Sequence, residues 1–108
     1  MIEVREYTDR SGRNHFARWF DKLNGEVQAR VTIAVERVRT GNLAGAKAAG
    51  GGVSELRLHF GPGYRIYFGR VGSSLVVLLG GGTKKRQSAD IEAAKILWNE
   101  HKAGKGSQ

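Results

Sequence analysis

The chain has 108 residues and a mass of 11.8 kDa, which is enough for one domain with its own core and too short for two. It contains no cysteine, which excludes disulfides, thiolate metal sites and cysteine nucleophiles. The longest apolar run, Leu75 to Leu79, is far too short for a membrane helix. The first residues contain no apolar segment typical of a signal peptide, so we expect a cytoplasmic protein.

The positive charge is concentrated in one part of the chain. The net charge is +8, yet residues 1–45 contain eight basic and six acidic side chains. Residues 46–87 contain seven basic side chains and a single acidic one, Glu55. A localised basic surface of this kind attracts phosphates, and it can equally bind an acidic protein partner.

The first half of the chain predicts one strand and two helices. Residues 2–8 alternate in hydropathy and predict a short strand, followed by a turn at 9–12. Apolar residues at helical spacing predict helices over 14–23 and 26–40. The break between them, Asn24-Gly25, is only two residues long and therefore favours a helical hairpin.

The second half predicts a small sheet and a last helix. The hydropathy period changes to two from Val53, and Gly61-Pro62-Gly63 has the composition of a tight turn. The expected elements are a flexible loop at 41–52, strands at 53–60, 64–69 and 75–79, a helix capped by Ser88, and a disordered tail at 103–108. The predicted fold is a single α+β domain of residues 1–102, with the order β-α-α-β-β-β-α. Its mostly antiparallel sheet is packed by the N-terminal helical hairpin.

The face of the sheet opposite the core is the main candidate for chemistry. Arg57 and His59 point the same way on one predicted strand, and Arg65 and Tyr67 do so on the next. Cations with one phenol suit binding of a phosphodiester, and the basic run 84–86 follows the last strand. The alternative is a solvated face without a role, on which Glu55 forms a salt bridge with a neighbouring arginine. The three histidines are widely spaced in the sequence, so we expect no metal site.

Two motifs resemble a known family. The run Glu55-Leu-Arg-Leu-His-Phe-Gly-Pro-Gly-Tyr-Arg-Ile-Tyr-Phe68, followed by Gly80-Gly-Gly-Thr-Lys-Lys-Arg-Gln87, resembles the RelE/ParE superfamily of bacterial toxins. The most similar branch is the HigB-like addiction module killer proteins. The resemblance implies the same β-α-α-β-β-β core. It also implies a ribosome-dependent endoribonuclease that cuts mRNA without a metal or cofactor, by attack of a ribose 2′-OH on its own 3′-phosphate.

The resemblance also implies partners and site residues. A cognate antitoxin, a helix-turn-helix protein as in HigA-like systems, would neutralise the toxin and carry any contact with DNA. The implied catalytic residues are Arg57, His59, Arg65, Lys84 and Lys85, and the RNA-binding residues are Lys47, Tyr67, Arg70 and Arg86. Ile91 stands where RelE carries a functional tyrosine. His59 is the better proton-transfer group, because an arginine with a pKa above about 12 is a poor base.

Two other functions remain open at this point. A ParE-like toxin would inhibit DNA gyrase and would have no nuclease chemistry. A basic RNA-binding module would have no toxicity at all, and a cell would then tolerate full expression of this chain alone.

Overall fold

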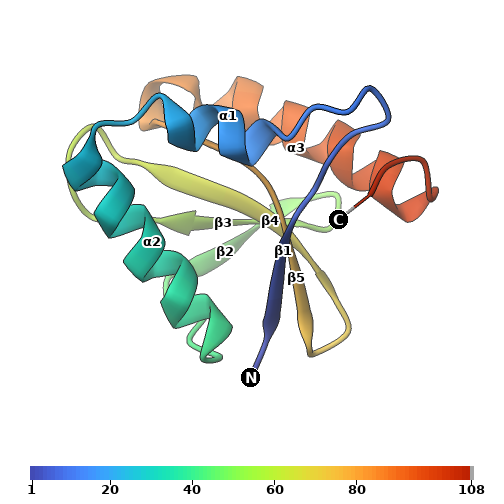
Figure 1. The fold of residues 1–108 in the computed structure, drawn as a ribbon, viewed down its shortest axis with the longest axis horizontal. Coiled ribbons are helices and arrows are strands. Elements are labelled where there is room, and N and C mark those ends of the chain that lie inside the picture. The colour runs from blue at the N-terminus through green and yellow to red at the C-terminus, as the bar shows by residue number, and fades with distance from the viewer. Residues whose placement is uncertain (108) are drawn as a thin grey trace.

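The computed structural model describes residues 1–107. Five strands form one sheet in the order β1-β5-β4-β3-β2, in which β1 is parallel to β5 and all other pairs are antiparallel (Figure 1). The strands are β1 Glu3–Glu6, β2 Ala46–Gly50, β3 Val53–Arg57, β4 Arg65–Val71 and β5 Leu75–Gly82. The predicted α+β class and the mostly antiparallel sheet are confirmed, and the sheet contains one strand more than predicted.

Two helices cover one face of the sheet. α1 spans His15–Asp21 and α2 spans Gly25–Arg39. Both begin at an asparagine cap: Oδ1 of Asn14 accepts a hydrogen bond from the N–H of Ala17 at 2.9 Å, and Asn24 does the same for Val27 at 3.0 Å. The helices differ in detail from the predicted hairpin. α1 packs mainly on β5, α2 contacts β1, and the two run in different directions (Figure 1).

A third helix, α3 at Gln87–Lys102, covers the other face of the sheet. Its Ala94, Leu97 and Trp98 pack against Tyr67 of β4 and against buried residues of β3 and β5. The prediction of an open polar face is therefore wrong for most of the sheet. Two features explain the difference. The strands are short, so their alternation of polar and apolar residues covers only a few positions. The apolar stripe of α3 must also be buried, and this face of the sheet is the surface on which it packs.

The segment predicted as a flexible loop contains the edge strand β2. Its backbone pairs antiparallel with β3, and Lys47 lies opposite Glu55. Ala46–Gly50 is rich in alanine and has little intrinsic strand preference, so the pairing depends on backbone hydrogen bonds to β3 rather than on side-chain pattern. Gly50, Gly51 and Gly52 all have positive φ and form the turn between the two strands.

The C-terminal part also differs from the prediction. β5 continues to Gly82, and a 3₁₀ turn, η1 at Lys84–Arg86, leads directly into α3, so Ser88 lies inside the helix and does not cap it. In the predicted tail at 103–108, Ser107 and Thr8 exchange backbone hydrogen bonds of 2.6 and 2.9 Å, and residue 108 lies outside the described residues. No helix within residues 1–107 is both long and apolar enough to cross a membrane.

Candidate functional site

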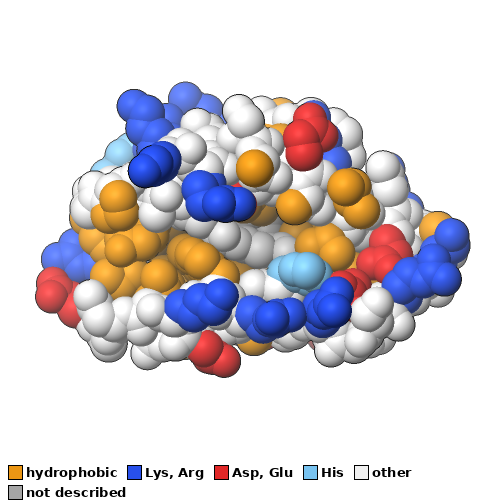
Figure 2. Space-filling view, turned by 90° about the horizontal axis from the view of Figure 1, so that it is seen from above, with side chains coloured by type: hydrophobic (Ala, Val, Ile, Leu, Met, Phe, Trp, Pro, Cys, Tyr) orange, Lys and Arg blue, Asp and Glu red, His pale blue; other side chains and the backbone are white. Residues whose placement is uncertain are grey.

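Five exposed basic side chains stand at the end of the sheet where β3 and β5 finish. We call them the basic rim; they are Arg57, His59, Lys84, Lys85 and Arg86. η1 is tied to the turn that follows His59, because the N–H of Lys84 donates to the carbonyl of Pro62 at 3.3 Å. In Figure 2, Lys and Arg side chains gather at the end of the face where α3 begins, with a histidine beside them. Arg57 and His59 were predicted to share one patch with Arg65 and Tyr67, and the structure groups them with residues 84–86 instead.

Arg65 lies beneath the basic rim and not on it. Its side chain is only 1% exposed, so the prediction that it lies on an open face is wrong. Nη1 donates to the carbonyl of Gly63 at 2.7 Å, and Nε lies 3.8 Å from Oε2 of Glu55. In the strand register Arg65 is opposite Arg57 on one side and Gly82 on the other. Arg65 therefore joins the turn to the middle of the sheet.

Glu55 is the second buried charge, and it links β3 to α3. Both of its carboxylate oxygens accept hydrogen bonds from Nε2 of Gln87, at 2.9 and 3.1 Å. The predicted salt bridge with a neighbouring arginine is confirmed by the contact with Arg65. Because Gln87 is the first residue of α3 and follows η1 directly, Glu55 helps to position the basic rim.

Tyr67 is also buried, which removes it from the predicted RNA-binding surface. Burial, together with the nearby carboxylates of Glu55 and Asp90, raises the pKa of Tyr67 to about 12. Its hydroxyl has no hydrogen-bond partner among residues 1–107. In this position the phenol stays protonated at neutral pH and cannot stack on a base.

The other predicted site residues are spread over the molecule. Lys47 is exposed on the edge strand β2, two strands away from Tyr67. Arg70 is exposed near the far end of β4, at the opposite end from Arg65, so the sheet does not bring it to the basic rim. Ile91 is half-buried and packs against the core under α3. The structure thus groups Arg57, His59 and residues 84–86 and separates Arg70 from them.

A small cavity of about 140 Å³ adjoins this region, between β5 and the first turns of α3. Tyr67, Asp90 and His15 line it, together with Gly80 and Gly81. Oδ2 of Asp90 is buried without a hydrogen-bond partner in the described chain. Burial raises the pKa of Asp90, and Arg86 partly offsets the effect. A carboxylate in this position disfavours a phosphate, so we do not place RNA in the cavity.

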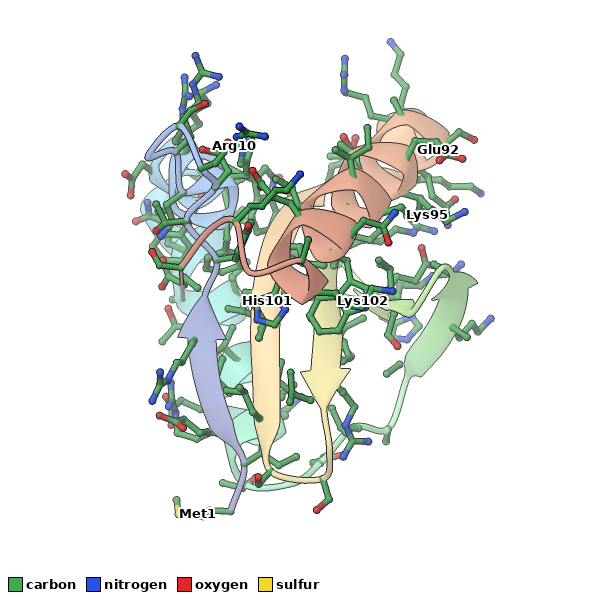
Figure 3. All side chains as sticks on the ribbon, turned by 90° about the vertical axis from the view of Figure 1, so that its right-hand side faces the viewer. Met1, Arg10, Glu92, Lys95, His101 and Lys102 are labelled. Atoms are coloured by element: carbon green, nitrogen blue, oxygen red, sulfur yellow. The ribbon has the colours of Figure 1, made fainter. Side chains whose placement is uncertain are left out.

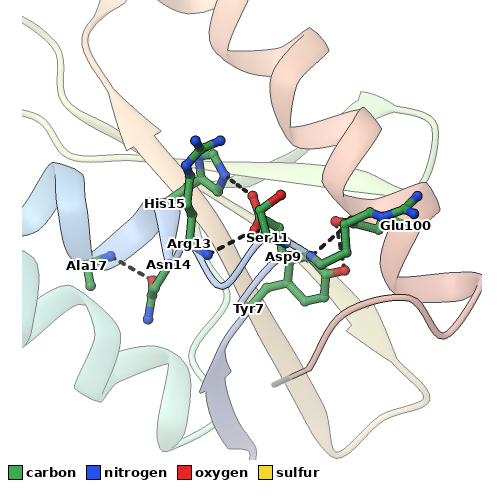
Figure 4. Close-up of polar contacts among 9 residues, drawn as sticks. Tyr7, Asp9, Ser11, Arg13, Asn14, His15, Ala17 and Glu100 are labelled. Carbon is green, nitrogen blue, oxygen red and sulfur yellow. Dashed lines mark hydrogen bonds and ion pairs between the residues drawn. The ribbon is translucent and has the colours of Figure 1, made fainter.

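Sequence reasoning missed two histidine contacts. Nε2 of His15 lies 2.8 Å from Oδ2 of Asp9, across a turn that also directs the N–H groups of Ser11 and Arg13 to the carboxylate (Figure 4). These contacts lower the pKa of Asp9 to about 2, with the Arg13 N–H making the largest contribution. His101 points from α3 toward the sheet and stacks on Trp98 at 4.8 Å between ring centroids (Figure 3). The contact between Asp9 and His15 could have been predicted from the sequence, because the two residues flank a turn-forming segment.

No three His, Cys, Asp or Glu side chains of residues 1–107 gather in a way that could hold a metal ion. The chemistry that the basic rim offers is binding of an anion and stabilisation of negative charge, with one imidazole for proton transfer. Arginine binds phosphate oxygens in a bidentate manner, and lysine neutralises charge as a compact cation.

Three comparisons with known proteins bear on the family and the fold. Residues 18–99 match the family model of the phage-derived Gp49-like proteins. An uncharacterized protein of Haemophilus influenzae is 38% identical over 86 residues, which cover 79% of this chain and 87% of that protein. A mutant of the Escherichia coli toxin RelE in the free state is similar in fold, with a TM-score of 0.61 at 15% identity over 89% of this chain and 96% of that one. The chain therefore belongs to the phage-derived Gp49-like family and has a RelE-like fold.

Proposed function

We propose that this protein is the toxin of a toxin–antitoxin pair, of the HigB-like kind, and that it cleaves mRNA on the ribosome in the cytoplasm. The observation that carries the proposal is the basic rim: four exposed lysine and arginine side chains and one exposed histidine at one end of a RelE-like sheet, with Lys84 hydrogen-bonded to the turn after His59. Family membership and the RelE-like fold support a toxin, and the side chains of the rim support RNA as its target.

In the proposed reaction His59 accepts the proton of a ribose 2′-OH, whose oxygen then attacks the adjacent phosphorus. The new bond joins the 2′-oxygen to phosphorus, and the bond from phosphorus to the 5′-oxygen of the next nucleotide breaks. The ammonium of Lys84 or Lys85 supplies the proton that the departing 5′-oxygen needs. Arg57 and the remaining lysine bind the phosphate oxygens, whose negative charge grows in the transition state.

The burial of Arg65 changes the role proposed for it. A guanidinium that is 1% exposed and donates to the carbonyl of Gly63 cannot contact a phosphate without a rearrangement of the structure around it. We assign it a positioning role, because it holds the turn to which Lys84 is hydrogen-bonded. Lys47 and Arg86 are exposed and remain proposed RNA contacts, and Arg70 lies too far along β4 to join them.

The test is induced expression of this chain alone, with growth and mRNA integrity followed together. We expect growth arrest and new mRNA 5′ ends inside translated frames. A variant that lacks His59, Lys84 and Lys85 should be tolerated, whereas Lys102→Ala, which removes an exposed lysine at the other end of α3, should stay toxic. Arrest with intact mRNA would contradict the proposal.

A second candidate function is inhibition of DNA gyrase in the manner of ParE. Ile91 in place of a tyrosine and the burial of Arg65 favour it, because both reduce the groups available for nuclease chemistry. Gyrase-dependent DNA breaks and filamentous cells, with mRNA left intact, would identify this function in the same experiment.

A further inference from the structure

Three consecutive glycines, Gly80 to Gly82, form the end of β5. Glycine weakens a strand, and it often marks a place where another group approaches the backbone closely. Packing explains two of the three glycines. A Cβ at Gly81 would overlap the indole of Trp19, and a Cβ at Gly82 would overlap the carboxylate of Asp90. Gly80 has no such neighbour, because a Cβ there would meet nothing within 4 Å in the described chain.

The open space beside Gly80 belongs to the cavity of about 140 Å³ between β5 and α3. Gly80 lies opposite Tyr67 in the strand register, and residues in this relation share one face of a sheet. Tyr67 packs under α3, so Gly80 faces α3 as well. The φ angle of Gly80 is not positive, so the backbone conformation does not require a glycine there. The effect of this glycine is to keep the cavity open.

Two buried oxygen atoms of the cavity lining are unpaired. Oη of Tyr67 and Oδ2 of Asp90 have no hydrogen-bond partner among residues 1–107, and both residues line the cavity. Tyr67 is only 1% exposed. Buried polar groups of folded proteins almost always have a partner. The two oxygens therefore indicate that the cavity holds a ligand able to form hydrogen bonds with both.

The carboxylate of Asp90 determines the sign of charge that suits the cavity. Arg86 lies 3.9 Å from the other carboxylate oxygen, Oδ1, and its side chain is 72% exposed, so solvent screens its charge. Burial raises the pKa of Asp90, and Arg86 offsets only part of this effect. The imidazole of His15 also lines the cavity, but its Nε2 is already bonded to Asp9. A cation with N–H donors would compensate the charge of Asp90.

The rest of the lining limits the size and shape of such a ligand. The other side chains are apolar, and they are Leu79, Ala93, Ala94 and Leu97. An apolar lining with a few polar groups is typical of small-molecule sites. The volume corresponds to roughly four or five water molecules of 30 Å³ each, which is too small for a nucleotide. His15, Ala93 and Leu97 also line a larger, open depression beside α3, which gives access from solvent.

We propose that this cavity binds a small aliphatic primary amine. Its ammonium group, which has three donors, pairs with Oδ2 of Asp90 and donates to Oη of Tyr67. Its alkyl chain lies against the leucines and alanines of the lining. The group that is recognised is the alkylammonium, which a free amine and a lysine side chain share. The inference does not depend on the proposed nuclease activity, because Asp90, Tyr67 and Gly80 take no part in the proposed reaction.

The probe is n-butylammonium chloride, titrated into the ¹⁵N-labelled full-length protein at neutral pH and constant ionic strength. Amide chemical shifts in NMR spectra follow the binding. We expect saturable shifts at Gly80, Ala93 and Ala94, with a dissociation constant of about 1–10 mM, as is common for a ligand of this size. 1-Butanol has the same length without the charge, and butyrate has the opposite charge. Both should bind at least about tenfold more weakly.

Three variants locate the binding. Asp90→Asn keeps the shape of the side chain and removes its charge, so it should weaken butylammonium binding by about tenfold or more. Glu92→Gln is the matched control, because its carboxylate is 71% exposed on the same helix and does not line the cavity. It should bind as the wild type does. Gly80→Val fills the open space and should abolish binding. Thermal melts without ligand confirm that each variant is folded.

Two results would overturn the proposal. Unchanged binding by Asp90→Asn, or equal affinity for butylammonium and 1-butanol, would show that the carboxylate does not select a cation. Absence of saturable shifts with every probe would show that the cavity holds water only. A peptide with one lysine and blocked ends distinguishes the two sources of the amine. If it binds more tightly than butylammonium, and Asp90→Asn loses this binding, the natural ligand is a lysine side chain, whereas weaker binding identifies a free amine.

Discussion

Nε of Arg65 lies 3.8 Å from Oε2 of Glu55, and both side chains are almost completely removed from solvent. The two residues bring a cation and an anion under the start of α3, where Gln87 binds the carboxylate and Gly63 accepts from the guanidinium. This pair joins three parts of the candidate site: β3, the turn at 61–63 and α3. Its energetics therefore affect both the stability of the fold and the position of the basic rim.

Removal of Arg65 should destabilise the protein. Arg65→Ala leaves the buried carboxylate of Glu55 without its cation, and loss of one partner of a buried pair costs about 3–5 kcal/mol. Urea unfolding measures the difference. Arg70→Ala, an exposed arginine on the same strand, is the control and should change the free energy of unfolding by less than about 0.5 kcal/mol. Equal stability of the two variants would show that the pair is not structural.

Substitution by alanine should lower the stability of the protein more at Gly69 than at Gly80. A Cβ at Gly69 would overlap the indole of Trp98, whereas a Cβ at Gly80 would meet nothing within 4 Å. We expect Gly69→Ala to cost about 1–3 kcal/mol through overpacking and Gly80→Ala to cost much less. Thermal unfolding followed by circular dichroism compares them directly. A smaller effect at Gly69 than at Gly80 would contradict the packing of α3 on β4.

The sequence predicts those helices and strands whose hydropathy pattern is contained within the element itself. The apolar spacing of α2 and the alternation from Val53 to Phe60 predict a helix and a strand, and both are observed within a few residues. β2 could not be predicted in this way, because its alanines carry no strand pattern and its hydrogen bonds come from β3. Alternation also cannot separate a solvated polar face from one that a helix covers. For that reason Arg65 and Tyr67 were expected on the surface with Arg57 and His59, whereas Arg65 and Tyr67 are buried and Arg57 and His59 are exposed.

Asp9, in the turn after β1, should make the stability of the protein depend on pH in the acid range. Its contacts hold the pKa of Asp9 at about 2, below the ordinary value of 3.8, so the unfolded chain takes up the proton first. The stabilisation is therefore complete above about pH 4 and is lost as the pH falls toward 2. Asp9→Asn should be less stable than wild type near neutrality, and the difference should shrink over that window. Unfolding midpoints in urea at several pH values measure it, and a constant difference would contradict this account.

The contribution of Asp90 to stability should have the opposite pH dependence to that of Asp9. Burial raises the pKa of its carboxyl, so the folded protein binds the proton more tightly than the unfolded chain does. The charged form costs stability at neutral pH, and the cost disappears as the pH falls through the raised pKa. Asp90→Asn should therefore be more stable than wild type near pH 7 and equal to it in acid. The same urea titrations test this, and a less stable variant at pH 7 would show that the carboxylate has a stabilising partner.

The central claim is that the basic rim cleaves RNA, and single-turnover cleavage of mRNA on programmed ribosomes tests it most directly. The wild type should cut the mRNA. His59→Ala, which removes the proposed proton acceptor, should lose about 10²–10⁴ in rate. Lys84→Ala should lose about 10²–10³, and Lys102→Ala should cleave as the wild type does. Cleavage at the wild-type rate by folded His59→Ala and Lys84→Ala, or no cleavage by the wild type, would contradict the account.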